Sequence, residues 1–321
     1  MKNHSLKVPV FIPIIIGIIA ISFSSIFVKW SSAPVSVQAM YRLLITLILM
    51  IPFVLKQSNW LKKITIKEYG LLILSGTFLA FHFLFWMGSL KLTTVASSTI
   101  LLSLQPVFVM VGAYLLFKEK TTKPALMSML VAIIGAILIG WGDIGISFTN
   151  IKGDILSVLG TIVVAIHMLI GQSLLKSIPS TLYSFIVFLA AVIVFTIYNL
   201  TLHIPMTGYS RIDWGIFILL AIVPTVFGHV LFNWLLKRVT AATISMAILG
   251  EPVGASLLAI ILLNETLSFT QCIGGLIVLL GLYFFLQNTR KKSKNNNPAI
   301  LAKPVNTGPI IKDEKRHTGI H

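Results

Sequence analysis

Long apolar runs separated by short polar segments make up most of the chain. Backbone N–H and C=O groups cannot stay unpaired in hydrocarbon, so an apolar run of about 20 residues predicts a membrane-spanning helix roughly 30 Å long. We predict ten such spans, at residues 10–30, 36–55, 69–89, 94–117, 124–141, 154–175, 182–200, 214–235, 240–263 and 270–288. The pattern therefore indicates an all-α membrane protein whose spans form one compact unit.

The first run begins after two lysines, Lys2 and Lys7, and so resembles a secretory signal peptide with a candidate cleavage site at Ser31 to Ala33. A signal peptide has an apolar region of roughly 7 to 15 residues, and the run from Val8 to Val28 is longer than that. It is long enough to span a bilayer. We therefore interpret it as a retained first helix.

Composition excludes a soluble protein. With 56% hydrophobic and 11% charged residues, the chain lacks the polar side chains that a water-facing surface needs. Its mean hydropathy is +0.95. The net charge of +16 would favour a nucleic-acid partner in a soluble protein, but the basic residues lie in short clusters between apolar runs. We interpret these clusters as topology signals and predict no nucleic-acid partner.

Basic residues tend to stay on the cytoplasmic side of a membrane. If the N-terminus is cytoplasmic, 20 of the 25 Lys and Arg residues fall on that side. Arg42 lies within a span, and the outer side holds only Lys29, Lys91, Lys152 and Arg211. The charge distribution predicts a multi-pass protein of the cell membrane with both termini in the cytoplasm.

The second half of the chain repeats the first at a shift of 146 residues. The shift places Leu90, Lys91, Thr94, Ala96, Pro106, Leu116, Glu119 and Gly135 on Leu236, Lys237, Thr240, Ala242, Pro252, Leu262, Glu265 and Gly281. Two unrelated apolar helices would match in hydrophobicity but would rarely align Lys, Pro and Glu together. The match predicts a duplication, with repeats at residues 8–148 and 149–289 and a disordered, basic cytoplasmic tail at residues 290–321.

Five helices in each repeat give the two repeats opposite orientations, because an odd number of crossings ends on the other side of the membrane. Inverted repeats of this kind are typical of secondary transporters that work by alternating access. The alternative is a duplicated structural bundle without transport.

Several segments together carry a family resemblance: Ala33 and Pro34 followed by Arg42, LKLTTVASS, LQPVF, LLFKEK, and GEPVGASLLAIILLNE. They resemble the paired EamA domains of the drug/metabolite transporter superfamily over residues 10–288. The resemblance implies ten helices in two EamA repeats around a central substrate cavity. It also implies transport of metabolites such as amino acids, frequently as efflux. In the first half LQPV stands where GEPV stands in the second, so only one repeat carries the buried acid.

Glu251 is the one acid of the chain near the centre of a span. A carboxylate at that depth is costly unless it is neutral or paired, so we take it as a candidate for substrate binding or proton coupling. Pro252, the next residue, removes a backbone hydrogen bond and predicts a helix break. The alternative is a protonated glutamic acid that bonds a neighbouring helix. Gln105, beside Pro106, occupies the corresponding place in the first repeat, where binding a polar solute and bridging two helices are equally open.

Two pairs of residues share one spacing. His82 and Trp86 are four residues apart on one helix face, as are His229 and Asn233 in the second repeat. Histidine can relay protons, and Trp can stack on an aromatic or cationic solute. We count these four and His167 as candidates lining one cavity. The alternative for each histidine is a hydrogen-bonded packing role.

Arg42 lies about six residues inside its span, roughly 9 Å from the outer edge at about 1.5 Å per residue. At that depth its side chain can nearly reach the interface, so a structural role competes with recognition of an anionic group or with gating. Lys29 is expected at the interface. Glu119 and Glu265 are expected at helix ends, where they resemble gating residues.

Signals for a cofactor or metal are lacking in the sequence. Cys272 is the only cysteine, so neither an intramolecular disulfide nor a cysteine-based zinc site can form, and its apolar surroundings predict burial. The histidines lack metal-ligand spacing, and no Walker-type glycine loop is present. We therefore predict a secondary transporter for a small polar metabolite, with protons as a candidate coupling ion, the lipid bilayer as its setting, and no enzymatic activity. The alternative is a membrane-embedded enzyme or a sensory protein.

Overall fold

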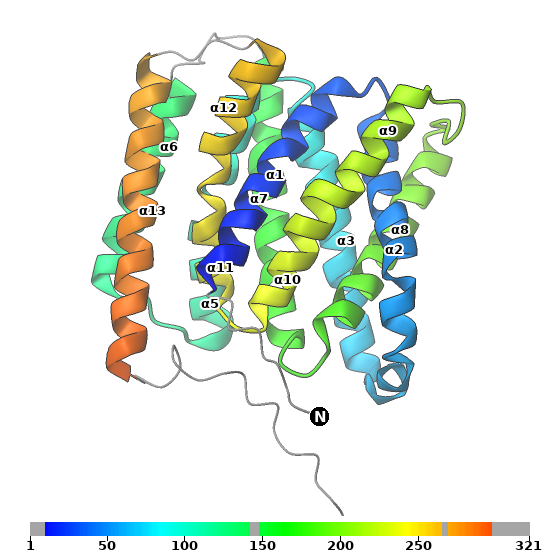
Figure 1. The fold of residues 1–321 in the computed structure, drawn as a ribbon, viewed down its shortest axis with the longest axis horizontal. Helices are drawn as coiled ribbons and strands as arrows, with labels where there is room; N and C mark the ends of the chain where they lie inside the picture. The colour runs from blue at the N-terminus through cyan, green and yellow to red at the C-terminus, as the bar shows by residue number, and fades with distance from the viewer. Residues whose placement is uncertain (1–9, 142–147, 265–268, 297–321) are drawn as a thin grey trace, which may run out of the picture.

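The computed structural model describes residues 10–141, 148–264 and 269–296, and this part of the chain is built from helices and short connections (Figure 1). The helices are α1 (Phe11–Trp30), α2 (Val35–Leu55), η1 (Ser58–Lys63), α3 (Ile66–Ser89), α4 (Val95–Leu102), α5 (Gln105–Phe117), α6 (Lys123–Trp141), α7 (Phe148–Leu174), α8 (Ser180–Thr201), α9 (Arg211–Leu220), η2 (Ala221–Val230), α10 (Leu231–Leu236), α11 (Ala241–Ile248), α12 (Glu251–Leu263) and α13 (Phe269–Asn296).

Eight stretches in this part of the chain are long and apolar enough to cross a membrane. Five are single helices, and three are composite: α4 with α5, α9 with η2 and α10, and α11 with α12. Two shorter apolar stretches, Lys123–Gly135 in α6 and Cys272–Phe285 in α13, lie where the remaining two spans were predicted. The all-helical prediction is confirmed, and eight of the predicted spans meet the requirement for length and apolarity.

The helices pack side by side, with α6 and α13 forming a pair at one flank (Figure 1). On the other side of the molecule, α3 packs on α7 and α8, and α2 packs on α8. In the centre, α1 lies against η2 and α12. The chain enters α1 and leaves α13 at the same edge of the molecule (Figure 1).

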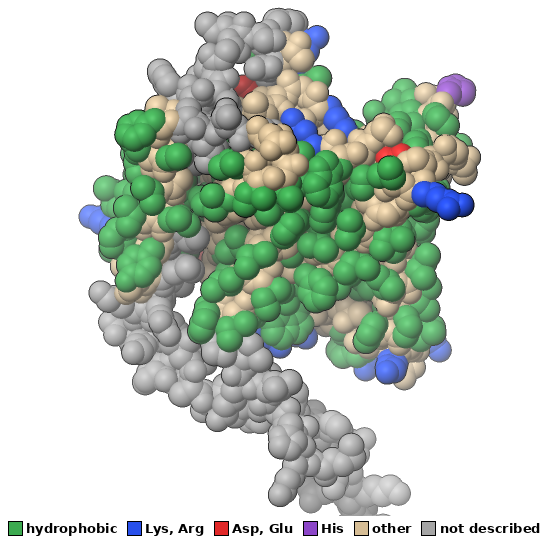
Figure 2. All heavy atoms as spheres, turned by 45° about the horizontal axis from the view of Figure 1, so that its top comes forward, with side chains coloured by type: hydrophobic (Ala, Val, Ile, Leu, Met, Phe, Trp, Pro, Cys, Tyr) green, Lys and Arg blue, Asp and Glu red, His purple; other side chains and the backbone are tan. Residues whose placement is uncertain are grey.

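Apolar side chains cover the outside of the bundle. Figure 2 shows a broad hydrophobic surface on the face in view, with Lys and Arg side chains gathered mainly toward its margins. Ile19, Ile48, Leu115 and Ile261 are among the large apolar residues that are more than half exposed. Such a surface would be unstable in water, and it suits contact with lipid acyl chains.

Hydroxyl and carboxylate groups tie helix ends together at both edges of the bundle. At the end of α1, Asp213 accepts hydrogen bonds from Ser31 Oγ at 2.7 Å and from Ser32 N at 3.0 Å. Lys91 Nζ donates to Val28 O at 3.0 Å and Ser31 O at 2.9 Å, capping the same helix end. Partial burial, together with the nearby charge of Lys29, lowers the pKa of Lys91.

A similar tie occurs at the opposite edge, where Ser177 Oγ donates to Glu68 Oε1 at 2.8 Å. Each acid stands three residues after a hydroxyl N-cap, Ser210 for Asp213 and Thr65 for Glu68. Lys29, expected at the interface, donates from Nζ to Thr93 O at 3.2 Å. These bonds hold the connections around the bundle in place.

Two predictions need correction. Cys272 is exposed on α13 rather than buried, because the apolar run in which it lies has both a buried face, with Val278, and an exposed face, with Leu276. The last helix continues to Asn296, past the predicted end at residue 288, since the polar residues that follow still favour helix. Lys2, Lys7, Glu265 and tail residues 297–321 lie outside the described residues.

Close helix packing at Gly76 provides a test of the fold. A Cβ atom there would lie 2.5 Å from Val187 O and 2.6 Å from Ala190 Cβ, both in α8. Gly76→Ala should therefore force α3 and α8 apart and lower stability by about 1–3 kcal/mol, as overpacking does. The measurement is the thermal unfolding midpoint of the protein purified in detergent.

Gly70→Ala is the matched control, because Gly70 lies in the same helix with no atom within 4 Å of the added Cβ. Its midpoint should stay the same or rise slightly, since Ala favours helix over Gly by up to about 1 kcal/mol. Equal midpoints for the two variants would contradict the α3–α8 packing.

Candidate functional site

Two spans are broken in the middle in the same way. The first continues from α4 to α5 across Ser103 and Leu104, and the second from α11 to α12 across Leu249 and Gly250. Pro106 and Pro252 are the second residues of α5 and α12, where the missing N–H of proline is tolerated. Thr94 caps the start of α4 and Thr240 the start of α11. Each break therefore sets one polar residue at the start of a helix inside the bundle, Gln105 in one span and Glu251 in the other.

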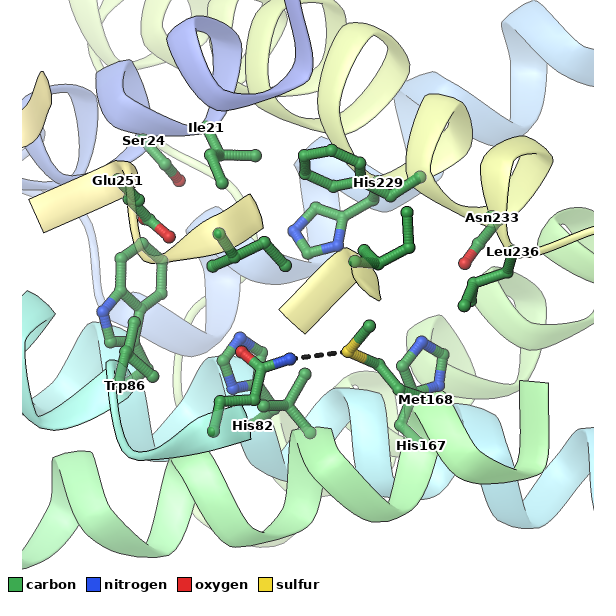
Figure 3. Close-up of a pocket in the computed structure, with 16 residues that line it drawn as sticks. Ile21, Ser24, His82, Trp86, His167, Met168, His229, Asn233, Leu236 and Glu251 are labelled. Atoms are coloured by element: carbon green, nitrogen blue, oxygen red, sulfur yellow. Dashed lines mark hydrogen bonds between the residues drawn. The ribbon is translucent and has the colours of Figure 1, made fainter. Parts of the chain in front are cut away.

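A cavity of about 60 Å³ lies between these breaks. A bound water needs at least about 10–15 Å³ on the same measure, so the cavity has room for a few waters or a small solute. Its walls come from Ile21, Ser24, His82, Trp86, Leu102, Gln105, Val164, His167, Met168, His229, Phe232, Asn233, Leu236, Ile244, Ile248 and Glu251 (Figure 3). Seven of the eight binding or coupling candidates from the sequence line this one cavity.

Glu251 is 6% exposed, and none of the described residues forms a hydrogen bond or ion pair with it. Its counterpart Gln105 is 3% exposed, and Gln105 Nε2 lies 2.6 Å from Met168 Sδ. A thioether is a weak acceptor, so this contact satisfies the amide only in part. Both polar groups are therefore available to a solute in the cavity.

The histidine rings are oriented by backbone carbonyls of neighbouring helices. His82 Nδ1 lies 3.0 Å from Gly160 O, and His167 Nδ1 lies 3.1 Å from Ser75 O. A carbonyl oxygen can only accept, so Nδ1 of His82 donates and its Nε2 stays without a bond to the protein. His167 Nδ1 also lies 2.8 Å from Ser75 Oγ, a hydroxyl that can either donate or accept. The His82 ring also stacks on Trp86, with centroids 5.9 Å apart, and Trp86 Nε1 has no partner in the described structure.

The second histidine pair stands on an irregular helix. Sequence analysis expects ordinary helix here, but Ala221–Val230 forms a π-helix, with Pro224 inside it and His229 near its end. Thr225 Oγ1 donates to Leu220 O at 2.7 Å, which satisfies a carbonyl at the start of the irregular segment. In α10, Asn233 Nδ2 donates to Ser184 Oγ at 3.0 Å. π-Helical turns frequently occur at functional sites, and Pro224 was the available sequence signal.

Arg42 is completely buried, so the expectation that it nearly reaches the interface is wrong. Its Nε donates to Thr225 Oγ1 at 2.9 Å and its Nη1 to Ser24 Oγ at 3.3 Å. The guanidinium lies 4.4 Å from the centroid of the Phe83 ring. These contacts hold the side chain inward, behind Ser24, which itself lines the cavity. Arg42 is therefore a fixed positive charge next to the cavity wall.

Known proteins that resemble this chain indicate the function of the cavity. The model of the EamA-like transporter family matches residues 9–141 and again residues 151–287. This chain belongs to the EamA-like transporter family. The family is part of the drug/metabolite transporter superfamily, so the resemblance noted in the sequence is confirmed. Its described residues include eight apolar stretches long enough to cross a membrane, so this EamA protein is a multi-pass membrane transporter.

Its relatives include transporters from archaea and bacteria. An uncharacterized transporter of Archaeoglobus fulgidus is 28% identical over 208 residues, covering 64% of this chain and 73% of that protein. One from Synechocystis sp. is 26% identical over 268 residues, covering 78% and 74%. The uncharacterized transporter YyaM of Bacillus subtilis is 24% identical over 220 residues, covering 67% and 71%. A solved crystal structure superposes with a TM-score of 0.70 over 88% of this chain and 98% of that chain, at 13% identity, which shows the fold alone.

Sequence reasoning missed part of the EamA cavity. Ser24 and Met168 contribute a hydroxyl and a thioether to its wall, and both stand in apolar runs that give no sign of it. Glu119, expected at a helix end, lies just after α5 and accepts a hydrogen bond from Gln172 Nε2 at 2.9 Å. Gln172 Oε1 in turn accepts from Ala241 N, which connects α7 to the start of α11.

The buried position of Arg42 gives a second test. Lysine carries a point charge and cannot hold Thr225 and Ser24 while stacking on Phe83. Arg42→Lys should therefore destabilise the protein by about 2 kcal/mol, the order expected for lost hydrogen bonds to a charged group. The thermal unfolding midpoint in detergent measures the effect. Arg211→Lys serves as control, since Arg211 is exposed at the start of α9 and should change little. An unchanged midpoint for Arg42→Lys would argue against these contacts.

Proposed function

We propose that this EamA protein is a secondary transporter that moves a small polar metabolite, an amino acid or a related compound, across the cell membrane. The observation that carries the proposal is the cavity between two broken helices, with the unpaired Glu251 at one break and Gln105 at the other. Non-helical backbone deep in a membrane is tolerated only where protein buries it or where it lines a cavity. Breaks of this kind form the substrate sites of many transporters. The family resemblance favours efflux.

Alternating access is proposed because ten helices in two inverted repeats, residues 8–148 and 149–289, account for the packing. When the two halves are exchanged, the most extensive helix contacts map onto other contacts that are also present. The contact of α1 with η2 becomes that of α7 with α3, and the contact of α5 with α11 becomes that of α12 with α4. The pairs α2–α8 and α6–α13 map onto themselves. Symmetry of this kind favours a mechanism in which the two repeats exchange conformations.

The cavity extends toward one edge of the bundle. It reaches Leu236, the last residue of α10, and Ile244 in the first turns of α11. On the other side of the breaks, Ser157 Oγ donates to Ser98 O at 2.6 Å and Thr161 Oγ1 to Leu101 O at 3.2 Å, joining α7 to α4. By the distribution of basic residues, the edge near Leu236 is cytoplasmic. We infer an inward-facing conformation.

Orientation can be tested with single cysteines in a Cys272→Ser background. Thr207 and Lys62 are exposed in connections at opposite edges of the bundle, and the charge pattern assigns Thr207 to the outside and Lys62 to the cytoplasm. In intact cells, a membrane-impermeant maleimide should label Thr207→Cys. Lys62→Cys should be labelled only after permeabilisation. The reverse pattern would overturn the proposed orientation.

Within the transporter proposal, we assign proton coupling to Glu251. Its carboxyl group lies in the cavity together with His82, His167 and His229, and with Arg42 behind the wall. Glu251→Gln should abolish flux driven by a pH gradient in reconstituted vesicles, because the amide cannot release a proton. The assay screens labelled amino acids and related metabolites, with Glu68→Gln as the control at a partly exposed acid. Undiminished gradient coupling in Glu251→Gln would exclude this role.

A further inference from the structure

The cavity wall presents several hydrogen-bond acceptors. Glu251 presents an unpaired carboxyl group, and Gln105 directs one amide N–H at Met168, which leaves its second N–H and Oε1 free in the described structure. His82 donates from Nδ1 to a carbonyl, so its neutral ring leaves Nε2 as an acceptor. Trp86 Nε1–H is an unpartnered donor among the described residues. A ligand that uses these acceptors must itself bring donors.

The charged residues at the cavity also bear on the class of ligand. Arg42 is held by Thr225, Ser24 and the Phe83 ring, and the structure describes no ion pair between it and Glu251. An anionic group beside Glu251 would face that carboxyl group, while the positive charge of Arg42 lies behind Ser24 and is not part of the described wall. A cationic group would find Glu251 as its counter-ion. A charge-assisted hydrogen bond to a carboxylate is roughly twice as strong as a neutral one, so an ammonium group is the best partner for that position.

Two of the polar side chains, Glu251 and Asn233, stand at separated ends of the cavity (Figure 3). In Figure 3, Glu251 and Trp86 lie at one end, and Asn233 lies at the other, with His229 and Met168 between them. Asn233 uses Nδ2 on Ser184 and leaves its Oδ1 as an acceptor. The side chains of Leu102, Phe232, Ile244 and Ile248 make much of the remaining wall apolar. This layout suits a ligand with an apolar middle and a donor at each end.

We propose that the cavity binds a short aliphatic chain carrying an ammonium group at one end, against Glu251, and a second hydrogen-bond donor at the other, against Asn233. Linear diamines are the simplest members of this class. The inference rests on the proposed function for the location of the binding site, and it narrows the substrate to a cationic amine. A zwitterionic amino acid fits less well, because none of the described lining residues is a Lys or Arg that would pair with its carboxylate.

Binding to the full-length protein purified in detergent tests the proposal without requiring transport. Isothermal titration calorimetry compares 1,4-diaminobutane with n-butylamine, 4-aminobutanoate and butane-1,4-diol, which match it in chain length and differ at the ends. Diamines of two to six carbons determine the preferred length. One diamine should bind at least tenfold more tightly than each of the three matched controls. Tighter or equal binding of 4-aminobutanoate or the diol, or no binding of any diamine, would overturn the proposal.

Two variants test which end of the ligand contacts Glu251 and which contacts Asn233. Glu251→Gln should weaken diamine and butylamine binding by at least tenfold, because both ligands lose their counter-ion. Asn233→Leu should weaken diamine binding while leaving butylamine unaffected. Glu68→Gln, remote from the cavity, should bind as the wild type does. A diamine affinity that is unchanged in Glu251→Gln would refute the assignment.

The ligand series on the wild-type protein decides the question even if a variant fails to fold. The result also separates this inference from the proposed function. Transport of a different solute class, with no diamine binding, would overturn the substrate class and leave the transporter in place. Diamine binding without flux of the diamine in vesicles would support the site and count against the transport proposal.

Discussion

The need to satisfy backbone hydrogen bonds in an apolar environment governs this structure. A helix meets that need within itself, so the chain crosses the bundle as helices, and a break is costly unless the freed groups are buried or face a polar cavity. The breaks before Gln105 and Glu251 lie where α4 with α5 and α11 with α12 pack against each other. The same constraint that forces helices elsewhere therefore concentrates exposed polar groups at one place, and the cavity forms there.

The two breaks share their geometry but differ in chemistry. Both have a capped eight-residue helix, a two-residue break and a thirteen-residue helix that ends at a residue with left-handed backbone, Lys118 or Asn264. Only the second repeat places a carboxyl group at the break. Symmetry of the backbone serves the proposed exchange of conformations, while the asymmetry of Gln105 and Glu251 gives the cavity one ionisable end. A symmetric pair of acids would add a second buried carboxyl group that the structure does not compensate.

Arg42 illustrates how one buried charge is held. Arg42 donates hydrogen bonds to Thr225 and Ser24 and lies over the face of Phe83, and these contacts replace part of the water that the guanidinium loses. Thr225 belongs to the π-helix that also carries His229, so the irregular helix serves both the charge and the cavity. The wall and the charge behind it thus depend on one another.

The sequence determined the features that depend on local patterns. Apolar runs specify helices, proline placed the two breaks, and the 146-residue match indicated that Gln105 and Glu251 correspond. The spacing of His82 with Trp86 and of His229 with Asn233 put each pair on one helix face. The tertiary structure decided the features that depend on which faces meet: the burial of Arg42, the exposure of Cys272, and the contributions of Ser24 and Met168 to the cavity. The buried and lipid-facing sides of an apolar helix have similar compositions, because lipid and the protein interior favour the same side chains. Only the packing of whole helices shows which side is buried.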